Sequence, residues 1–314
     1  MIDAIVTYVD EKVPEWRKNF NYWKEKEIRE GKTRRSNRQA FGEERTRDWN
    51  AFKYWFRAIE TNCPWINKVF LIVQDEKHVP DWIDKSNPKL RIVYHDEYIP
   101  KELLPTYNAM PIGMYIANIE DLSEKYIMFD DDYYVLNPIK EDRFFKDNKP
   151  VQPNNRVPYG LYKGDCLTCQ AKVFYHTLNN DLIFEKKYMT EKVKYGFSHL
   201  PSARKKSFEK KILEDNKQEI LNSFIRSKFR NKTNLCSFIF DDLLKICNEA
   251  YIEDPYYNCA YCSLTSKVNF DNYLDKDMVC FNDTEILDDY EKTKKAFIEF
   301  LEKKLPNKSK YEKE

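Results

Sequence analysis

Three consecutive carboxylates, Asp130, Asp131 and Asp132, follow the mostly apolar run 125–129, and aromatic residues come directly after them. Adjacent carboxylates repel one another, and a charge at the edge of a hydrophobic core is costly unless something compensates it. A divalent cation would do so, because Mg²⁺ and Mn²⁺ prefer hard oxygen ligands and can hold a substrate phosphate. The alternative is a solvated loop after a strand. The position of the triplet in the predicted fold favours the cation.

Strand and helix signals alternate along the first half of the chain. Buried strands are predicted at residues 2–9, 68–73, 90–94 and 125–129, and helices at residues 14–29, 48–61, 80–83 and 108–119. This alternation is typical of an α/β fold with a mainly parallel, Rossmann-like sheet flanked by helices. In such sheets ligands bind beyond the carboxyl ends of the strands. Asp10 and the triplet both follow strands, so we expect them to share one site.

The second half of the chain predicts a largely helical structure. After a long ordered loop at 151–168, helices are predicted at residues 169–178, 203–223, 234–249 and 285–304. We therefore divide the chain into an α/β half at 1–150, a mostly helical half at 151–302 that completes the site, and a charged tail at 303–314. We expect the tail to fray. Contact of its five lysines with an anionic membrane surface is the functional alternative.

The composition excludes several classes of protein. With 314 residues and 42% apolar content, the chain makes one large domain or two intimate ones. Its formal net charge of +1 gives no whole-molecule attraction to nucleic acid. Glycine-rich phosphate-binding motifs and apolar 18-residue windows are both absent from the sequence. The first residues resemble a strand and not a secretion signal, so we expect a cytoplasmic protein.

Basic residues gather in a segment that the pattern predicts to be a loop, residues 31–47. They are Lys32, Arg34, Arg35, Arg38, Arg45 and Arg47. A loop of this length inside a compact domain is uncommon without a role. We therefore interpret it as a basic lid over an anionic substrate, with a solvated loop as the alternative.

Two pairs among the eight cysteines have C-x-x-C spacing, Cys166/Cys169 and Cys259/Cys262. Together they would make a structural Zn²⁺ site. The pairs are far apart in the sequence and lack the flanking glycines of zinc ribbons. Ordinary buried thiols are therefore the preferred interpretation.

Four short blocks occur in a characteristic order. The first is Ile2-Asp-Ala-Ile-Val-Thr-Tyr-Val-Asp10 with Pro14-Glu-Trp16, and the second runs from Arg45-x-x-Asp48 through Leu104-Pro-Thr-Tyr-Asn108 to Phe129-Asp-Asp-Asp132. The third is His199-Leu-Pro201 with Ser227-Lys-Phe-Arg230, and the fourth is Cys280-Phe-Asn-Asp283. These blocks resemble those of the Stealth family of hexose-1-phosphate transferases, which includes bacterial capsular polysaccharide phosphotransferases and the catalytic subunit of the lysosomal-enzyme N-acetylglucosamine-1-phosphotransferase.

The resemblance implies a reaction and its participants. A sugar-1-phosphate would pass from a UDP-sugar to a hydroxyl of a glycan or lipid-linked oligosaccharide acceptor, releasing UMP and leaving a phosphodiester in a surface polysaccharide. Residues 1–150 would then bind the nucleotide sugar and the metal. The chain departs from the family pattern at Ala51, Lys53 and Asp130, which leaves the sugar and the acceptor open.

The resemblance also implies roles for individual residues. Asp131, Asp132 and Asp283 would bind Mg²⁺ or Mn²⁺, although Asp283 and its neighbour Asn282 are alternatively a cap for the final helix. His199 would be the general base on the acceptor hydroxyl or a nucleophile, and Arg230 would contact the transferring phosphate, with Asp132 as the third catalytic residue. The substrate-binding residues would be Asp10, Arg45, Asp48, Arg57, Asn108 and Asn282. Arg57 is alternatively a brace for the sheet.

Two other functions stay open on the sequence. An ordinary metal-dependent glycosyltransferase would use Asp130-x-Asp132 as its metal motif and release UDP instead of UMP. A non-catalytic carbohydrate-binding or zinc-stabilised scaffold protein would turn over no UDP-sugar at all. The released nucleotide separates these three functions.

Overall fold

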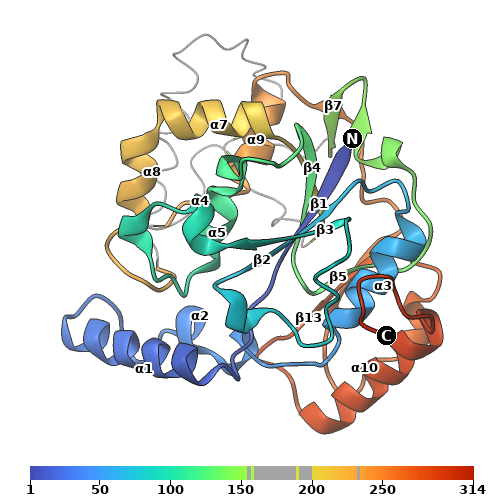
Figure 1. Cartoon of the computed structure of the whole chain (residues 1–314), viewed down its shortest axis with the longest axis horizontal. Helices are drawn as coiled ribbons and strands as arrows, with labels where there is room; N and C mark the ends of the chain where they lie inside the picture. Colours follow the sequence, from blue (N-terminus) through green and yellow to red (C-terminus); the bar gives the residue numbers. More distant parts are fainter. Residues whose placement is uncertain (154–156, 159–188, 191–199, 232–233) are drawn as a thin grey trace.

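A computed structural model describes residues 1–153, 157–158, 189–190, 200–231 and 234–314 (Figure 1). Its central sheet has five strands in the order β10-β4-β1-β2-β3. They are β1 (Ile2–Thr7), β2 (Val69–Val73), β3 (Leu90–Tyr94), β4 (Lys125–Phe129) and β10 (Ser202–Lys205). The first four are parallel and β10 is antiparallel to β4. The predicted mixed α/β architecture with a mostly parallel central sheet is therefore confirmed.

The strand order creates an opening at the carboxyl ends of β1 and β4. From β1 the chain proceeds through β2 to β3 on one side, whereas β4 pairs with the other side of β1. Loops that leave two such neighbouring strands in opposite directions form a crevice, where open α/β sheets bind their ligands. The segment after β1 and the triplet Asp130–Asp132 after β4 both lie at this crevice.

Helices cover both faces of the sheet because alternate strand residues point to opposite sides. On β2, Val69 and Leu71 pack into one apolar cluster and Phe70 and Ile72 into the other. The helices of the described residues are α1 (Pro14–Arg29), α2 (Arg38–Phe41), α3 (Phe52–Asn62), α4 (His95–Tyr98), α5 (Ala109–Met114), α7 (Lys206–Asp215), α8 (Lys217–Phe224), α9 (Ile239–Ile246) and α10 (Tyr290–Lys304). In Figure 1, α3 and α10 lie on one side of the sheet, and α5, α7 and α9 lie on the other.

Smaller sheets extend the structure beyond the central one. One joins β5 (Tyr133–Val135), β12 (Cys259–Ser263) and β13 (Met278–Asn282) in the order β12-β13-β5. Another joins β6 (Phe145–Lys146), β7 (Lys149–Gln152) and β11 (Tyr251–Ile252), and β8 (Val157–Pro158) pairs with β9 (Met189–Thr190). The second half of the chain thus contributes strands as well as helices, so the largely helical half is not confirmed. The strands were missed because several are only two to five residues long, too short for a periodic signal.

Other elements differ from their predicted form. The predicted helix at 80–83 is wrong: these residues form a turn, and Ile83 makes a β-bridge with Glu312. The predicted helix 108–119 is α5 followed by a 3-10 turn. The predicted helix 203–223 is wrong at its start, where residues 203–205 belong to β10, and the remainder is divided at Asn216 into α7 and α8. The predicted helix 169–178 lies outside the described residues. The 3-10 turns are Glu43–Arg45, Glu76–His78, Lys101–Leu103, Ile116–Asn118, Glu141–Arg143 and Phe270–Tyr273.

The C-terminal tail does not fray. Ser309 and Tyr311 are buried, and Glu312 forms an ion pair with Arg57 of α3 with a closest distance of 2.8 Å. Tyr311 also packs against Phe56, with ring centroids 5.2 Å apart. The prediction of a frayed tail was wrong because a short, lysine-rich terminus gives no sequence signal of the few side chains that anchor it.

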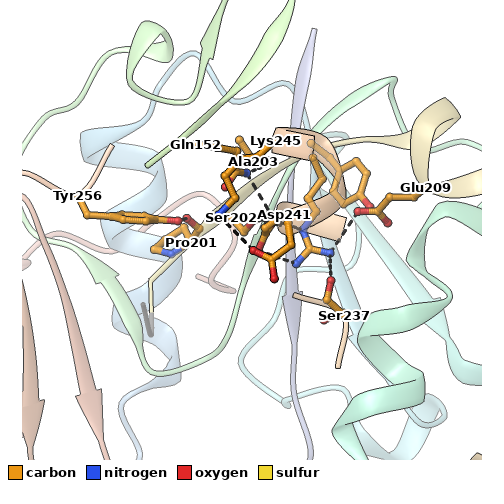
Figure 2. Close-up of polar contacts among 12 residues, drawn as sticks. Gln152, Pro201, Ser202, Ala203, Glu209, Ser237, Asp241, Lys245 and Tyr256 are labelled. Atoms are coloured by element: carbon orange, nitrogen blue, oxygen red, sulfur yellow. Dashed lines mark hydrogen bonds and ion pairs between the residues drawn. The ribbon is translucent and has the colours of Figure 1, made fainter. Parts of the chain in front are cut away.

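A buried polar network fixes β10 to the edge of the central sheet (Figure 2). Arg204 is 1% exposed, and its guanidinium forms ion pairs with Glu209 of α7 at 3.2 Å and Asp241 of α9 at 3.1 Å. The Tyr126 hydroxyl of β4 donates to the other oxygen of Glu209 at 2.5 Å, and the Ser202 hydroxyl donates to Asp241 at 2.5 Å. A buried cation with two carboxylate partners ties two helices and two strands together.

Candidate active site

A cavity of about 130 Å³ opens at the carboxyl ends of β1 and β4. Six residues selected from the sequence line it: Arg45, Asp48, Asp131, Asp132, Asn282 and Asp283. They come from three stretches that are far apart in the sequence. The structure therefore brings these six predicted residues together around one cavity.

Asp132 is a partly buried carboxylate that lines the cavity. Its backbone carbonyl accepts a hydrogen bond from Phe281 N–H at 2.9 Å, which joins the triplet to β13. Its Oδ2 accepts from the Cys280 thiol at 3.4 Å, whereas its Oδ1 is buried without a hydrogen-bond partner among the described residues. Desolvation and the charges of Asp130 and Asp131 raise the pKa of Asp132 well above its usual range. The fold therefore holds a carboxylate oxygen that still requires a donor or a cation.

Asp131 lies beside it in a different setting. The residue is exposed and lines the cavity. Desolvation and the charges of Asp130 and Asp48 raise the pKa of Asp131 to about 7. Two neighbouring carboxylates with raised pKa values are a site at which a divalent cation would relieve repulsion.

Asp283 reaches the cavity from the end of β13 and is held by two cationic or polar donors. Both of its oxygens accept hydrogen bonds from Arg47 Nη1, at 2.8 and 2.9 Å, and Oδ2 accepts from Trp49 Nε1 at 3.1 Å. Burial raises the pKa of Asp283, and the bonds from Arg47 and Trp49 oppose this shift. Among the described residues, no three His, Cys, Asp or Glu side chains are arranged to hold a metal ion. The oxygens of Asp131 and Asp132 suit a hard cation, but the third predicted ligand is engaged by Arg47.

The segment that carries Arg47 is anchored at Asp48. The Asp48 carboxylate accepts from Lys12 Nζ at 2.5 Å, and its backbone carbonyl accepts from the Tyr290 hydroxyl and from Lys294 Nζ of α10. Burial acts to raise the pKa of Asp48, but the hydrogen bonds from Lys12 and Asn50 N–H and the charges of Lys12 and Lys294 together outweigh it and lower the pKa. Asp48 is therefore an ionised anchor between the first loop and α10.

Comparisons with known proteins identify the family of this chain. Residues 45–152 match the family model described as Stealth protein CR2, conserved region 2. The chain is 31% identical to the capsular polysaccharide phosphotransferase WcwK of Streptococcus pneumoniae, over 99% of this chain and 98% of that protein. The chain belongs to the Stealth family. It is also 28% identical to the receptor polysaccharide phosphotransferase WefC of Streptococcus oralis, over 99% of both chains.

Other residues that the Stealth resemblance selected lie outside the cavity wall formed by the described residues. Asp10 turns the chain after β1, where its carboxylate accepts from Lys12 N–H at 2.8 Å. Arg230 is half-buried with its guanidinium 3.8 Å from the Met110 sulfur. Desolvation and the nearby Arg45 lower the pKa of Arg230, and Asp130 opposes this effect. Arg230 therefore lies between the basic segment and the triplet, beside the cavity. His199 lies outside the described residues.

Arg57 and Asn108 have structural contacts in the Stealth fold described here. Arg57 is buried and donates to both oxygens of Glu312, at 2.8 Å each, so the alternative of a structural brace describes its contacts. Asn108 is 2% exposed, caps α5 by accepting from Met110 N–H, and donates to Asn234 at 2.8 Å. Their contacts explain their presence without a substrate.

Asn108→Ala is expected to lower the free energy of unfolding by about 1–3 kcal/mol, because it removes a helix cap and a buried hydrogen bond. The KM for the donor should stay unchanged in the folded fraction. Chemical denaturation together with initial-rate kinetics checks both, with the exposed Asn222→Ala on α8 as the control. A raised KM at unchanged stability would instead show that Asn108 binds the substrate.

The sequence did not identify three side chains that shape the Stealth site. Tyr8 lines the cavity and stacks on Phe52 with ring centroids 4.4 Å apart. Cys280 donates to Asp132, and Arg47 binds Asp283. In the sequence, Arg47 stands out only as one of the basic residues of 31–47. Among these basic residues, Arg45 and Arg47 line the cavity. The lid interpretation of that segment stays a prediction.

The zinc prediction is not tested as a whole. Cys166 and Cys169 lie outside the described residues. Cys259 and Cys262 both belong to β12, where residues three apart point to opposite faces. Cys259 contacts Arg143, whereas the buried Cys262 contacts Tyr273. This pair does not chelate one ion in the observed strand.

Proposed function

We propose that the protein transfers a sugar-1-phosphate from a UDP-sugar to an acceptor hydroxyl during the synthesis of a surface or capsular polysaccharide. The observation that carries the proposal is the convergence of Asp131, Asp132 and Asp283 with Arg45 and Arg47 around one cavity. Such a set provides sites for a cation and for a diphosphate. The full-length similarity to proteins named as polysaccharide phosphotransferases supports the same reaction class.

The bond changes follow from the donor's diphosphate. The acceptor oxygen attacks the phosphorus that carries the sugar, the bond from that phosphorus to the bridging oxygen breaks, and UMP leaves with the bridging oxygen. The sugar and its phosphate stay together as a phosphodiester with the acceptor. The hydroxyl proton must pass to a base, a role for which His199 is our candidate.

The charged residues divide the remaining work. Asp131 and Asp132 would hold Mg²⁺ or Mn²⁺, which supplies charge neutralisation at the diphosphate when bound. Arg45, which lines the cavity, and Arg230, which interacts with Arg45 and Asp130, would contact the phosphate oxygens, since an arginine fork binds such oxygens in two places. Asp10, Asp48 and Asn282 would orient the remainder of the donor. Each role is a proposal for a named side chain.

The acceptor side is proposed on chemistry alone. A glycan or lipid-linked oligosaccharide would present the hydroxyl, from the cytoplasmic face of a membrane. No helix among the described residues is long and apolar enough to cross a membrane. In the packed tail Lys308 and Lys310 are exposed, so peripheral contact with anionic lipid through these lysines is compatible with the anchored Tyr311.

The decisive experiment identifies the released nucleotide. The protein is incubated with a panel of UDP-sugars, Mg²⁺ and a short glycan acceptor, and the products are separated by chromatography and mass spectrometry. We expect UMP and an acceptor that carries the sugar and one phosphate, with turnover lost in EDTA and restored by Mn²⁺. Release of UDP would establish an ordinary glycosyltransferase instead. No turnover with any UDP-sugar would favour a binding protein.

A further inference from the structure

The Arg47–Asp283 pair occupies the third position of the predicted metal site. Arg47 Nη1 contacts both carboxylate oxygens at 2.8 and 2.9 Å, and the two side chains are 19% and 9% exposed. Both residues line the cavity that contains Asp131 and Asp132. The pair is therefore neither a surface contact nor a remote structural bridge.

Asp132 lines the same cavity but differs from Asp283 in the hydrogen bonding of its carboxylate oxygens. Its Oδ1 is buried without a hydrogen-bond partner among the described residues, although Arg47 lines the same small cavity. β13 fixes the two acids close in the fold, because Phe281, two residues before Asp283, hydrogen-bonds to the Asp132 carbonyl. Both oxygens of one acid are thus engaged by a cationic side chain, while one oxygen of a neighbouring acid lacks a partner among the described residues.

We propose that Arg47 is an exchangeable partner, which neutralises Asp283 in the ligand-free protein and moves to the donor's diphosphate when a divalent cation engages Asp283. This inference rests on the proposed function. In the resting pair Nη1 alone contacts both Asp283 oxygens, and Nη2 donates to Glu43 at 3.3 Å. A diphosphate would offer oxygens to both nitrogens, in the planar fork with which a guanidinium binds phosphate. When Arg47 leaves, the positive charge of the cation takes the place of the guanidinium charge beside the Asp283 carboxylate.

The exchange needs a side-chain movement only. The backbone around Arg47 is fixed on its C-terminal side, where Asp48 binds Lys12 through its carboxylate and Tyr290 through its carbonyl. Trp49 Nε1 also donates to Asp283 at 3.1 Å, a contact that stays in place when Arg47 leaves. Arg47 is therefore a residue of the substrate site whose resting position is set by Asp283.

Mn²⁺ binding to the protein without nucleotide tests the exchange without any turnover. Arg47→Ala is expected to tighten Mn²⁺ binding about tenfold, because the cation no longer competes with a charge-assisted hydrogen bond. Arg45→Ala is the matched control, since it removes one positive charge from the same cavity without removing the partner of Asp283. It should tighten Mn²⁺ binding much less. Electron paramagnetic resonance of free Mn²⁺ measures both affinities.

The same variants have the opposite effect on the nucleotide. In saturating Mn²⁺, Arg47→Ala should weaken UDP binding about tenfold by isothermal titration calorimetry, since the diphosphate loses its guanidinium partner. Arg47→Lys keeps the charge but not the fork and should fall between the parent and Arg47→Ala in both measurements. In the double variant Arg47→Ala/Asp283→Asn, the gain in Mn²⁺ affinity should disappear.

The outcomes separate this inference from the proposed function. If Arg47→Ala tightens Mn²⁺ binding no more than Arg45→Ala, or leaves UDP binding unchanged, the exchange is wrong even if UMP is the product. If UDP is released in the product experiment while the Mn²⁺ and UDP affinities change as expected, the exchange holds and the phosphotransferase proposal fails. Thermal melting of each variant excludes loss of the fold as the cause.

Discussion

Asp132→Asn is expected to reduce turnover about 10³-fold or more while the melting temperature stays at or above that of the parent. The variant removes a ligand of the cation, so the cation is no longer held at the diphosphate. Turnover falls because the charge stabilisation that the cation supplies there amounts to several kcal/mol. The measurement is the initial rate of UMP release at saturating UDP-sugar and Mg²⁺, together with a calorimetric scan.

The stability of this variant has a separate physical cause. Desolvation and the neighbouring Asp130 and Asp131 already disfavour the charged form of Asp132 in the folded protein, as its raised pKa shows. An amide at this position imitates the neutral form and removes one of three adjacent charges. Folding should therefore gain slightly or stay constant, as expected for a carboxylate that the fold retains for function and not for stability.

Asp130→Asn is the matched control, because it removes a charge from the same triplet. Asp130 stands where the Stealth pattern has an Asn, so turnover should stay within about tenfold of the parent. A comparable loss in both variants would mean that the total charge of the triplet matters and not the Asp132 ligand. Loss of the fold in Asp132→Asn would show that the acids are structural.

Local patterns were sufficient to predict the frame of this site. β2, β3 and β4 each have a run of apolar and β-branched residues, and α1 begins at Pro14 as its sequence predicts. A parallel sheet brings the carboxyl ends of neighbouring strands together, so the triplet could be placed at a ligand site without coordinates. The resemblance to the Stealth family added Asn282 and Asp283 to the predicted site. In the structure these two residues lie at the end of β13 and line the same cavity.

Pairings between distant residues could not be predicted in this way. Arg47 and Asp283 are 236 residues apart, and neither has a local pattern that specifies the other. The same holds for Arg57 and Glu312, which are 255 residues apart. Propensity and periodicity describe which face of an element is buried, whereas a charge pair depends on two side chains that only the complete fold brings together. This is why the sequence predicts neither the contact between Arg47 and Asp283 nor the anchored tail.

Glu312→Ala is expected to lower the free energy of unfolding by about 3–5 kcal/mol, because it leaves the buried Arg57 guanidinium without its carboxylate. The side chains of the pair are 9% and 5% exposed, and Arg57 makes two bonds to Glu312 and one to the Leu305 carbonyl. The KM for the donor should not change, since this pair lies outside the cavity wall formed by the described residues. Chemical denaturation and donor kinetics measure the two effects.

The double variant Arg57→Met/Glu312→Leu tests the cause. Replacing both charges by apolar side chains of similar size leaves no unpaired ion, so this variant should be much more stable than Glu312→Ala.

The pH dependence of stability gives a second check on the Arg57–Glu312 pair. Burial acts to raise the pKa of Glu312, but the Arg57 contact and the hydrogen bonds from Ser309 together outweigh it and lower the pKa. The contribution of the pair is therefore fully present above the ordinary glutamate pKa of about 4.3 and is lost as the pH falls through the lowered value. A stability difference from Glu312→Gln that persists below that range, or a donor KM that rises in the double variant, would contradict a purely structural role for Arg57.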